Sequence, residues 1–374
     1  MKDSEYLKYI NESNQLKNNS KEIYTRRLTN IKNYMWEQTN GIIDENTTYS
    51  YDTTFDFIIS NPKIFIKYLN DFLKSKKGRQ GETLGLHVKE GYVNVIKALF
   101  NYTPSKKQYD NNQFNIWCKV YMKIKKPLDD QYKSNKPTKR QEEAYIPFEE
   151  LDKKRKLLPK GSPERLLLSM YTLIPPVRND YWRTRIYKNY EDYNKNKNID
   201  SLAKNYIIFD FNYKDYIENN EEENEENITE DNAEIYNLTV DINDDISLLV
   251  LNEYKTAKYH GQLNIILPNE LKKEIQYSLD ERPRDYLFVY ISTGKPFKDS
   301  GALTKWANPK LKKLFNNEKI SIITFRNIYV SRRDLELETK SGLERDKIAK
   351  IMGHSLEQQQ KYLWHTYLKN LKLI

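Results

Sequence analysis

Cysteine and histidine are scarce in this chain of 374 residues, which has one cysteine and four histidines. Because Cys118 is alone, no disulfide can form within these residues, and a reducing compartment is expected. Cys118 lies in an apolar helical pattern and is expected to be a buried structural residue. The histidines are His87, His260, His354 and His365. Their spacing is not that of a metal site, so no metal or other cofactor is expected.

Long hydrophobic runs are also missing. No apolar run reaches the roughly 20 residues that a membrane-spanning helix needs, and the N-terminal residues lack the apolar stretch of a signal peptide. Hydrophobic residues make up 38% of the chain, and its mean hydropathy is −0.88. These features predict a soluble, intracellular protein with no membrane partner. If the protein is viral, they predict the host cytoplasm or nucleus.

Charge is abundant and unevenly distributed. The chain carries 62 Lys and Arg against 53 Asp and Glu, a net charge of +9. Residues 218–234 hold eight Glu and one Asp without any Lys or Arg, so the remaining chain is more basic than the total. This balance favours an anionic partner, nucleic acid first. The acidic stretch is expected to be a solvated surface insertion, with a DNA-mimicking strip as the alternative.

The chain divides into two regions of different pattern. Apolar residues at helical spacing predict a helical domain over residues 1–125, and a basic stretch containing prolines, 126–141, predicts a linker. Residues 142–374 mix helical patterns with strand-like runs. We therefore expect a mainly helical α+β fold in two domains, the second with a small antiparallel sheet. The strand-like runs are residues 207–209, 235–240, 247–252 and 263–267.

Four residues in the second region indicate chemistry on phosphate. Arg178 follows Pro-Pro-Val, Arg326 lies in Ile-Thr-Phe-Arg-Asn, His354 lies in Met-Gly-His-Ser, and Tyr362 comes after it. An arginine fork binds phosphate oxygens bidentately and keeps its proton. A phenol has an ordinary pKa of about 10 and needs such cations to act as a nucleophile near neutral pH. The set suits a site that attacks a phosphodiester with a tyrosine.

In this order the motifs resemble the tyrosine recombinase, or phage-type integrase, family. The Pro-Pro-x-Arg-x-Asp version is similar to integrases of large DNA viruses and mobile elements. The resemblance implies a two-domain DNA clamp, in which a helical core-binding domain precedes the catalytic domain. It also implies cleavage and rejoining of double-stranded DNA through a 3′-phosphotyrosine intermediate, without metal or ATP. The expected assembly is a homo-oligomer, a tetramer on paired sites.

The resemblance assigns a role to each residue of the set. Arg178 and Arg326 would hold the phosphate, with Asp180 orienting Arg178. His354 would reach a phosphate oxygen, and Tyr362 would be the nucleophile.

Two positions leave alternatives open. Lys255 lies at a turn between two strand-like runs, where the family carries a lysine that protonates the leaving 5′-oxygen as general acid, and Lys258 is a competing candidate. Ile323 stands where the family usually has histidine, and isoleucine neither donates to phosphate nor moves a proton. A catalytically silent DNA-binding protein of recombinase descent therefore remains an alternative, as does a type IB topoisomerase.

Basic residues in the expected first domain and linker are candidate phosphate contacts. Such contacts would position a duplex without reading its sequence. They are Lys76, Lys77, Arg79, Lys136, Lys139 and Arg140.

Overall fold

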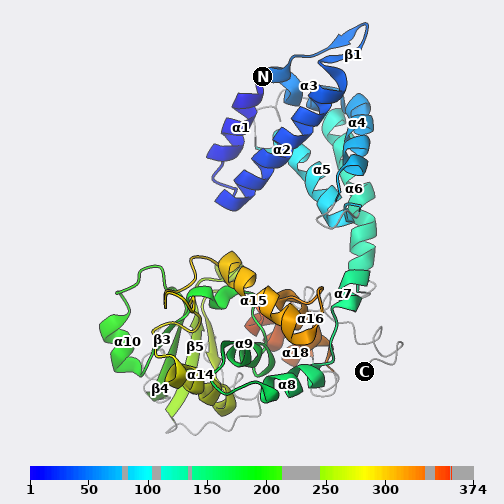
Figure 1. Ribbon diagram of the computed structural model, residues 1–374. Helices are drawn as coiled ribbons and strands as arrows, with labels where there is room; N and C mark the ends of the chain where they lie inside the picture. The colour runs from blue at the N-terminus through cyan, green and yellow to red at the C-terminus, as the bar shows by residue number, and fades with distance from the viewer. Residues whose placement is uncertain are drawn as a thin grey trace. The chain divides into compact units, whose positions relative to one another are not determined.

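The protein is mostly helical and divides into two compact units, Met1–Ser134 and Asn135–Ile374, in the computed structural model (Figure 1). Each unit has its own hydrophobic core. The residues that the structure describes are 1–77, 83–102, 111–133, 137–212, 245–332, 342–353 and 355.

Unit 1 is a helical bundle with one short antiparallel hairpin. The apolar residues Leu28, Ile31 and Met35 recur at helical spacing, and all three are buried in the core on one face of the long helix α2. This confirms the helical character expected for the first region. The elements are α1 (Asp3–Glu12), α2 (Asn18–Thr39), β1 (Ile42–Asp44), β2 (Thr47–Thr48), a 3-10 turn (Tyr51–Thr53), α3 (Thr54–Ser60), α4 (Pro62–Ser75), α5 (Leu86–Asn101) and α6 (Asn111–Lys133).

The predicted linker, residues 126–141, is helical over much of its length. Helix α6 continues through Pro127 to Lys133. A proline inside a helix removes one main-chain hydrogen bond but does not always end the helix, and the next residue, Leu128, is buried. Helix α7 (Lys139–Glu143) then begins at Thr138, whose side chain accepts from the main chain of Gln141. The boundary between the units thus lies beyond the expected end of the first domain.

In unit 2, helices pack around a sheet. Helix α9 is buried along most of its length, and its side chains share the main core with α14, α15, α16 and the sheet. The helices are α8 (Phe148–Leu157), α9 (Pro163–Thr172), a 3-10 turn (Asp180–Arg183), α10 (Tyr190–Asn196), α13 (Ala257–His260), α14 (Asn269–Glu281), α15 (Ser300–Phe315), α16 (Ile322–Ser331) and α18 (Gly342–Ile351).

The sheet of unit 2 is mixed, which corrects the prediction of an antiparallel sheet. Its order is β3-β4-β5-β6, and β3 pairs parallel with β4 while the other pairs are antiparallel. The three-residue strand β3 is too short to produce a periodic pattern in the sequence. The strands are β3 (Arg185–Tyr187), β4 (Tyr206–Asn212), β5 (Asp245–Leu251) and β6 (Leu263–Ile266).

Three of the four strand-like runs are confirmed as β4, β5 and β6. The fourth run, 235–240, and the acidic insertion, 218–234, lie outside the described residues. Cys118 is half-buried on α6, so the expectation of a fully buried thiol was wrong. In the described part of the chain, no helix combines the length and apolar character needed to cross a membrane.

Candidate functional site

Arg178 lies on an irregular segment that leaves the buried end of α9. Pro175 and Pro176 interrupt the helical course of the chain, since proline lacks the N–H that a helix needs. The hydroxyl of Tyr171 donates to the carbonyl of Arg178 at 2.6 Å. This bond fixes the main chain of Arg178 against α9, while its side chain stays half-exposed.

Arg326 lies on α16, where every residue except Ile323 is buried. The side chain of Arg326 is itself buried, at 1% exposure. Its guanidinium donates to the carbonyl of Pro176 at 2.9 Å and to the carbonyl of Met352 at 2.8 Å. Arg326 therefore ties the segment before Arg178 to the segment before His354.

The predicted lysine turn is a loop that joins β5 to β6, and we call residues 252–262 the hairpin loop. The loop contains the short helix α13, and Lys255 and Lys258 are both exposed on it. Between them, Thr256 donates its hydroxyl to the carbonyl of Gly353 at 2.6 Å. The hairpin loop is thus attached to the Met-Gly-His-Ser motif.

Four segments distant in the sequence meet at residues 352–353. The carbonyl of Met352 accepts from Arg326, and the carbonyl of Gly353 accepts from Thr256 and, at 3.4 Å, from Arg178. Gly353 has φ +65°, and a Cβ there would lie 3.1 Å from the ring of Tyr254. A left-handed backbone in so close a contact favours glycine. We call the meeting point of Arg178, Thr256 and Arg326 with Met352 and Gly353 the arginine centre.

Asp180 contributes negative charge near the arginine centre. Burial raises the pKa of its carboxyl, while the positive charges of Arg178 and Arg326 and a hydrogen bond from the main chain of Arg178 oppose that rise. The sequence predicted that Asp180 orients Arg178. The contact runs through the main chain of Arg178 and through charge.

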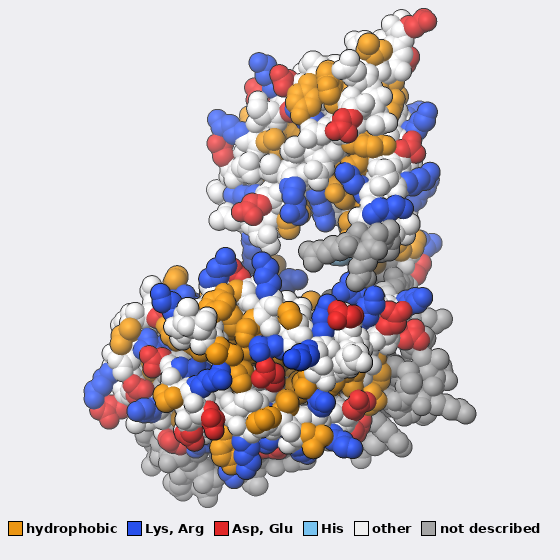
Figure 2. All heavy atoms as spheres, viewed as in Figure 1, with side chains coloured by type: hydrophobic (Ala, Val, Ile, Leu, Met, Phe, Trp, Pro, Cys, Tyr) orange, Lys and Arg blue, Asp and Glu red, His pale blue; other side chains and the backbone are white. Residues whose placement is uncertain are grey.

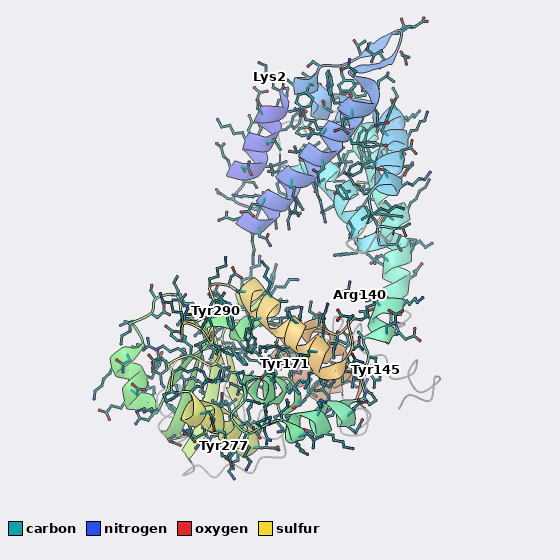
Figure 3. The ribbon with its side chains drawn as sticks, in the orientation of Figure 1. Lys2, Arg140, Tyr145, Tyr171, Tyr277 and Tyr290 are labelled. Carbon is teal, nitrogen blue, oxygen red and sulfur yellow. The ribbon has the colours of Figure 1, made fainter. Side chains whose placement is uncertain are left out.

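Two phenols of the arginine centre are held in the neutral form. Burial raises the pKa of Tyr171 well above its usual range, although the charge of Arg326 opposes this rise. Burial, assisted by the charge of Asp180, raises the pKa of Tyr254 to about 12. The hydroxyl of Tyr254 donates to the carbonyl of Gly261 at 2.8 Å. Both phenols hold main chain in place, and Tyr171 lies in the middle of unit 2 (Figure 3).

His354 and Tyr362 lie outside the described residues, and their roles stay predictions. Tyr171, Thr256 and Pro176 were not assigned a role from the sequence. Pro176 lies in the Pro-Pro-Val-Arg motif and Thr256 directly follows Lys255, but only contacts across the fold show what each of the three residues holds.

The predicted DNA-contacting residues are only partly described. Lys76 and Lys77, at the end of unit 1 helix α4, and Lys139 and Arg140, on α7, are exposed. Figure 2 shows Lys and Arg side chains across the surfaces of both units, with Asp and Glu among them. Two further predicted contacts, Arg79 and Lys136, fall outside the described residues.

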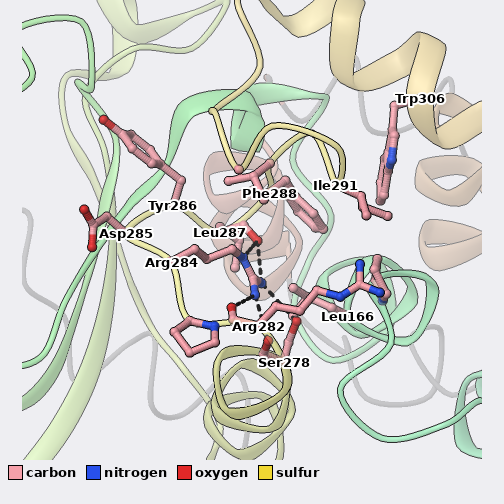
Figure 4. Close-up of a pocket in the computed structure, with 14 residues that line it drawn as sticks. Leu166, Ser278, Arg282, Arg284, Asp285, Tyr286, Leu287, Phe288, Ile291 and Trp306 are labelled. Atoms are coloured by element: carbon pink, nitrogen blue, oxygen red, sulfur yellow. Dashed lines mark hydrogen bonds between the residues drawn. The ribbon is translucent and has the colours of Figure 1, made fainter.

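A pocket of about 630 Å³ lies elsewhere in unit 2, between α9, the end of α14, the loop after it and α15 (Figure 4). The guanidinium of Arg284 donates five hydrogen bonds, to Ser278, Arg282 and Leu287. Burial and the neighbouring charge of Arg282 lower the pKa of Arg284 to about 10. Because these donors are engaged with the protein, Arg284 builds the pocket wall.

Among the described residues, no group of His, Cys, Asp and Glu is arranged to hold a metal ion. Comparisons with protein-family models, with curated proteins and with solved structures gave no match to the chain. The features of this chain that indicate a function are therefore the residues of the arginine centre and of the motifs around it.

Proposed function

We propose that the protein is a tyrosine-type recombinase or integrase that cleaves and rejoins double-stranded DNA. The observation that carries the proposal is the arginine centre. Arg178, the hairpin loop, Arg326 and the Met-Gly-His-Ser motif were selected from the sequence alone. In the fold, hydrogen bonds join all four at two neighbouring carbonyls.

In the proposed reaction, the phenolic oxygen of Tyr362 attacks a backbone phosphorus and forms a 3′-phosphotyrosine bond. The bond from phosphorus to the 5′-oxygen breaks, and Lys255 gives that oxygen a proton, with Lys258 as the competing donor. A 5′-hydroxyl then attacks the phosphotyrosine, re-forms the phosphodiester and releases the phenol. The bond energy is retained throughout, so the proposal requires neither ATP nor metal.

The charges of the arginine centre support phosphate binding. Arg178 and Arg326 donate hydrogen bonds to carbonyl oxygens, which are neutral groups, so these bonds hold the guanidiniums without themselves cancelling their charge. Arg178 is half-exposed and is the better placed of the two for direct contact. Arg326 is buried, so its main-chain bonds position the motif while its charge acts over a short distance.

The proposal extends to the partners. Double-stranded DNA would be held by both units as a clamp, and a homotetramer would bring paired sites together. The exposed lysines and arginines at the end of α4 and on α7 would contact phosphates.

A silent DNA-binding protein of recombinase descent is the second candidate. Ile323 favours it, because this side chain is 65% exposed on α16 at the position where the family has histidine. An exposed isoleucine adds no donor to a phosphate. Loss of one such donor costs on the order of 10²-fold in rate.

A duplex nicked close to the cleavage position decides between the two candidates, because the short 5′ fragment diffuses away and traps the covalent adduct. We expect the wild-type chain to form a protein–DNA adduct, Tyr362→Phe to form none, and Arg178→Ala to lose at least about 10²-fold in rate. Arg282→Ala, which removes an exposed arginine at the pocket mouth, is the matched control and should retain activity. An adduct with Tyr362→Phe would show that the nucleophile is another residue. Binding without any adduct would establish the silent protein.

Salt dependence tests the clamp. Each neutralised phosphate contact lowers log K by about 0.9 per tenfold rise in salt concentration. We therefore expect affinity to fall steeply with salt, and the slope to decrease by about one unit when Lys139 and Arg140 are replaced singly by alanine. A flat salt profile would contradict the clamp.

A further inference from the structure

The hairpin loop (residues 252–262) carries an exposed aromatic ring. Tyr259, on α13, is 73% exposed, whereas most large apolar side chains of unit 2 are buried in its core. The ammonium of Lys258 lies 4.6 Å from the centre of the Tyr259 ring, and Lys255 is exposed four residues earlier. The loop therefore presents one ring and two cations to solvent.

The base of the hairpin loop is held firmly. The side chain of Asn205, which is 5% exposed, accepts from the main chain of Asn252 at 2.9 Å and of Glu253 at 2.8 Å. It also donates to the carbonyl of Glu253 at 2.9 Å. Three bonds from one buried amide fix the start of the loop.

Two more bonds fix the middle and the end of the loop. Thr256 donates to Gly353, and the hydroxyl of Tyr254 donates to the carbonyl of Gly261. The exposed ring of Tyr259 thus belongs to a loop whose main chain is anchored on both sides of it. Ordering this ring on binding costs little conformational entropy, since the loop is already fixed.

We propose that Tyr259 stacks on a base next to the phosphate held at the arginine centre, and that Lys258 contacts a flanking phosphate while Lys255 stays the proton donor. This inference rests on the proposed function and adds a base contact to it. Aromatic rings stack on any base, and lysines bind the backbone as point charges. A rigid loop bearing both, attached through Thr256 to the same carbonyl as Arg178, places a base contact beside the cleavage chemistry.

Tyr259 is proposed to contact a base and carries no charge. The test therefore separates its contribution to DNA affinity from that of the charged lysines. The probe is the nicked duplex with 2-aminopurine substituted in turn at the bases around the nick. We expect wild-type protein to change the fluorescence at one position and Tyr259→Ala to abolish that change. Tyr259→Ala should also weaken binding about 5- to 150-fold without altering the salt slope. Lys258→Ala should instead lower the slope by about one unit.

Two controls identify the ring as the cause. Tyr259→Phe keeps the ring and should match wild type, and Ile291→Ala removes another exposed apolar side chain of unit 2, 52% exposed, and should change nothing. Thermal unfolding of all variants checks that the fold is intact.

The outcomes separate this inference from the proposed function. Wild-type binding and adduct formation that Tyr259→Ala leaves unchanged would overturn the stacking role alone. A wild-type chain that binds DNA without forming an adduct would overturn the cleavage chemistry, and the affinities would still decide the role of Tyr259. If the wild-type chain binds no DNA, both are wrong.

Discussion

Arginines hold unit 2 together in two places, with different partners. Between α8, α9 and α14, Arg165 forms a two-pronged pair with Glu274 at 2.6 and 2.7 Å, and Arg155 donates to Asp152 and Glu270. At the arginine centre, Arg326 and Arg178 instead donate to carbonyls of Pro176, Met352 and Gly353.

The difference shows how the same residue type serves two purposes in one fold. A carboxylate cancels the charge of a guanidinium, and the hydrogen bond to Glu274 raises the pKa of Arg165 further above its usual range. A carbonyl fixes the position of a guanidinium and leaves its charge in place. The carboxylate-bound arginines thus stabilise the fold, and the carbonyl-bound arginines form an anion site in the proposed function.

The largest expected effect comes from breaking the carboxylate-bound pair. Glu274 is 4% exposed, and Glu274→Ala would leave the buried Arg155 and the partly buried Arg165 beside a missing charge. Removing one partner of a buried pair typically costs about 3–5 kcal/mol. Urea denaturation of the full chain should show a loss of this size in unit 2. Glu270→Ala, at a side chain 54% exposed, is the control and should cost less than about 1 kcal/mol. Equal losses of stability in Glu274→Ala and Glu270→Ala would contradict the larger contribution expected of the buried carboxylate.

The next largest effect on stability is expected at the carbonyl-bound arginines. Arg326→Met keeps an apolar stem but removes two charge-assisted bonds, so we expect a loss of about 2–4 kcal/mol in the free energy of unfolding. Arg178→Ala removes one long bond of a half-exposed side chain and should cost less than about 1 kcal/mol. Both should slow adduct formation at least about 10²-fold. Stability without activity in Arg178→Ala would separate charge from scaffolding, whereas a comparable loss of stability in both variants would show that Arg178 is a structural residue.

Another carboxylate paired with an arginine, Asp200, extends the comparison to the effect of pH. Although burial alone would raise its pKa, hydrogen bonds from Arg183 and Tyr286 lower it to about 2. The folded-state value is below the unfolded one, so this stabilisation is present above about pH 4 and is lost as the pH falls towards 2. Asp200→Asn should cost about 2 kcal/mol at pH 7.

Urea denaturation across pH measures this contribution, and the wild-type and Asp200→Asn curves should converge near pH 2. A cost that stays constant down to that pH would mean that the asparagine disturbs packing and does not report the lost charge.

The smallest expected effect is at Thr256, which joins the hairpin loop to Gly353 through one hydrogen bond. Thr256→Val keeps the shape and should cost about 1 kcal/mol, with a slower adduct formation because Lys255 loses its fixed position. Thr256→Ser should restore both quantities. If Thr256→Val forms the adduct at the wild-type rate, the loop does not depend on this bond.

The sequence predicted more of the fold where patterns are long. The helical spacing of α2 and the apolar runs of β4, β5 and β6 were sufficient to identify those elements. The continuation of α6 through Pro127 was missed, because local proline chemistry argues for a break while packing of the helix decides otherwise. Strand β3 was missed because three residues leave no period to read.

The candidate site shows the same limit. Arg178, Lys255 and Arg326 were found as motif residues, but the sequence did not show that Arg326 is buried and bonded to main chain. Tyr171 was one among 30 tyrosines, and nothing local distinguishes it. Its role depends on a contact with a carbonyl seven residues away.

By itself, the sequence determined the basic charge, the main helices and strands, and the residue types on which a phosphate site would depend, since these follow from composition and local periodicity. Only the tertiary structure decided that Arg178, Thr256 and Arg326 meet at Met352 and Gly353. That meeting depends on how α9, α16 and the sheet pack. Packing is set by the whole core rather than by any one segment, because each helix and strand buries its apolar face against several others.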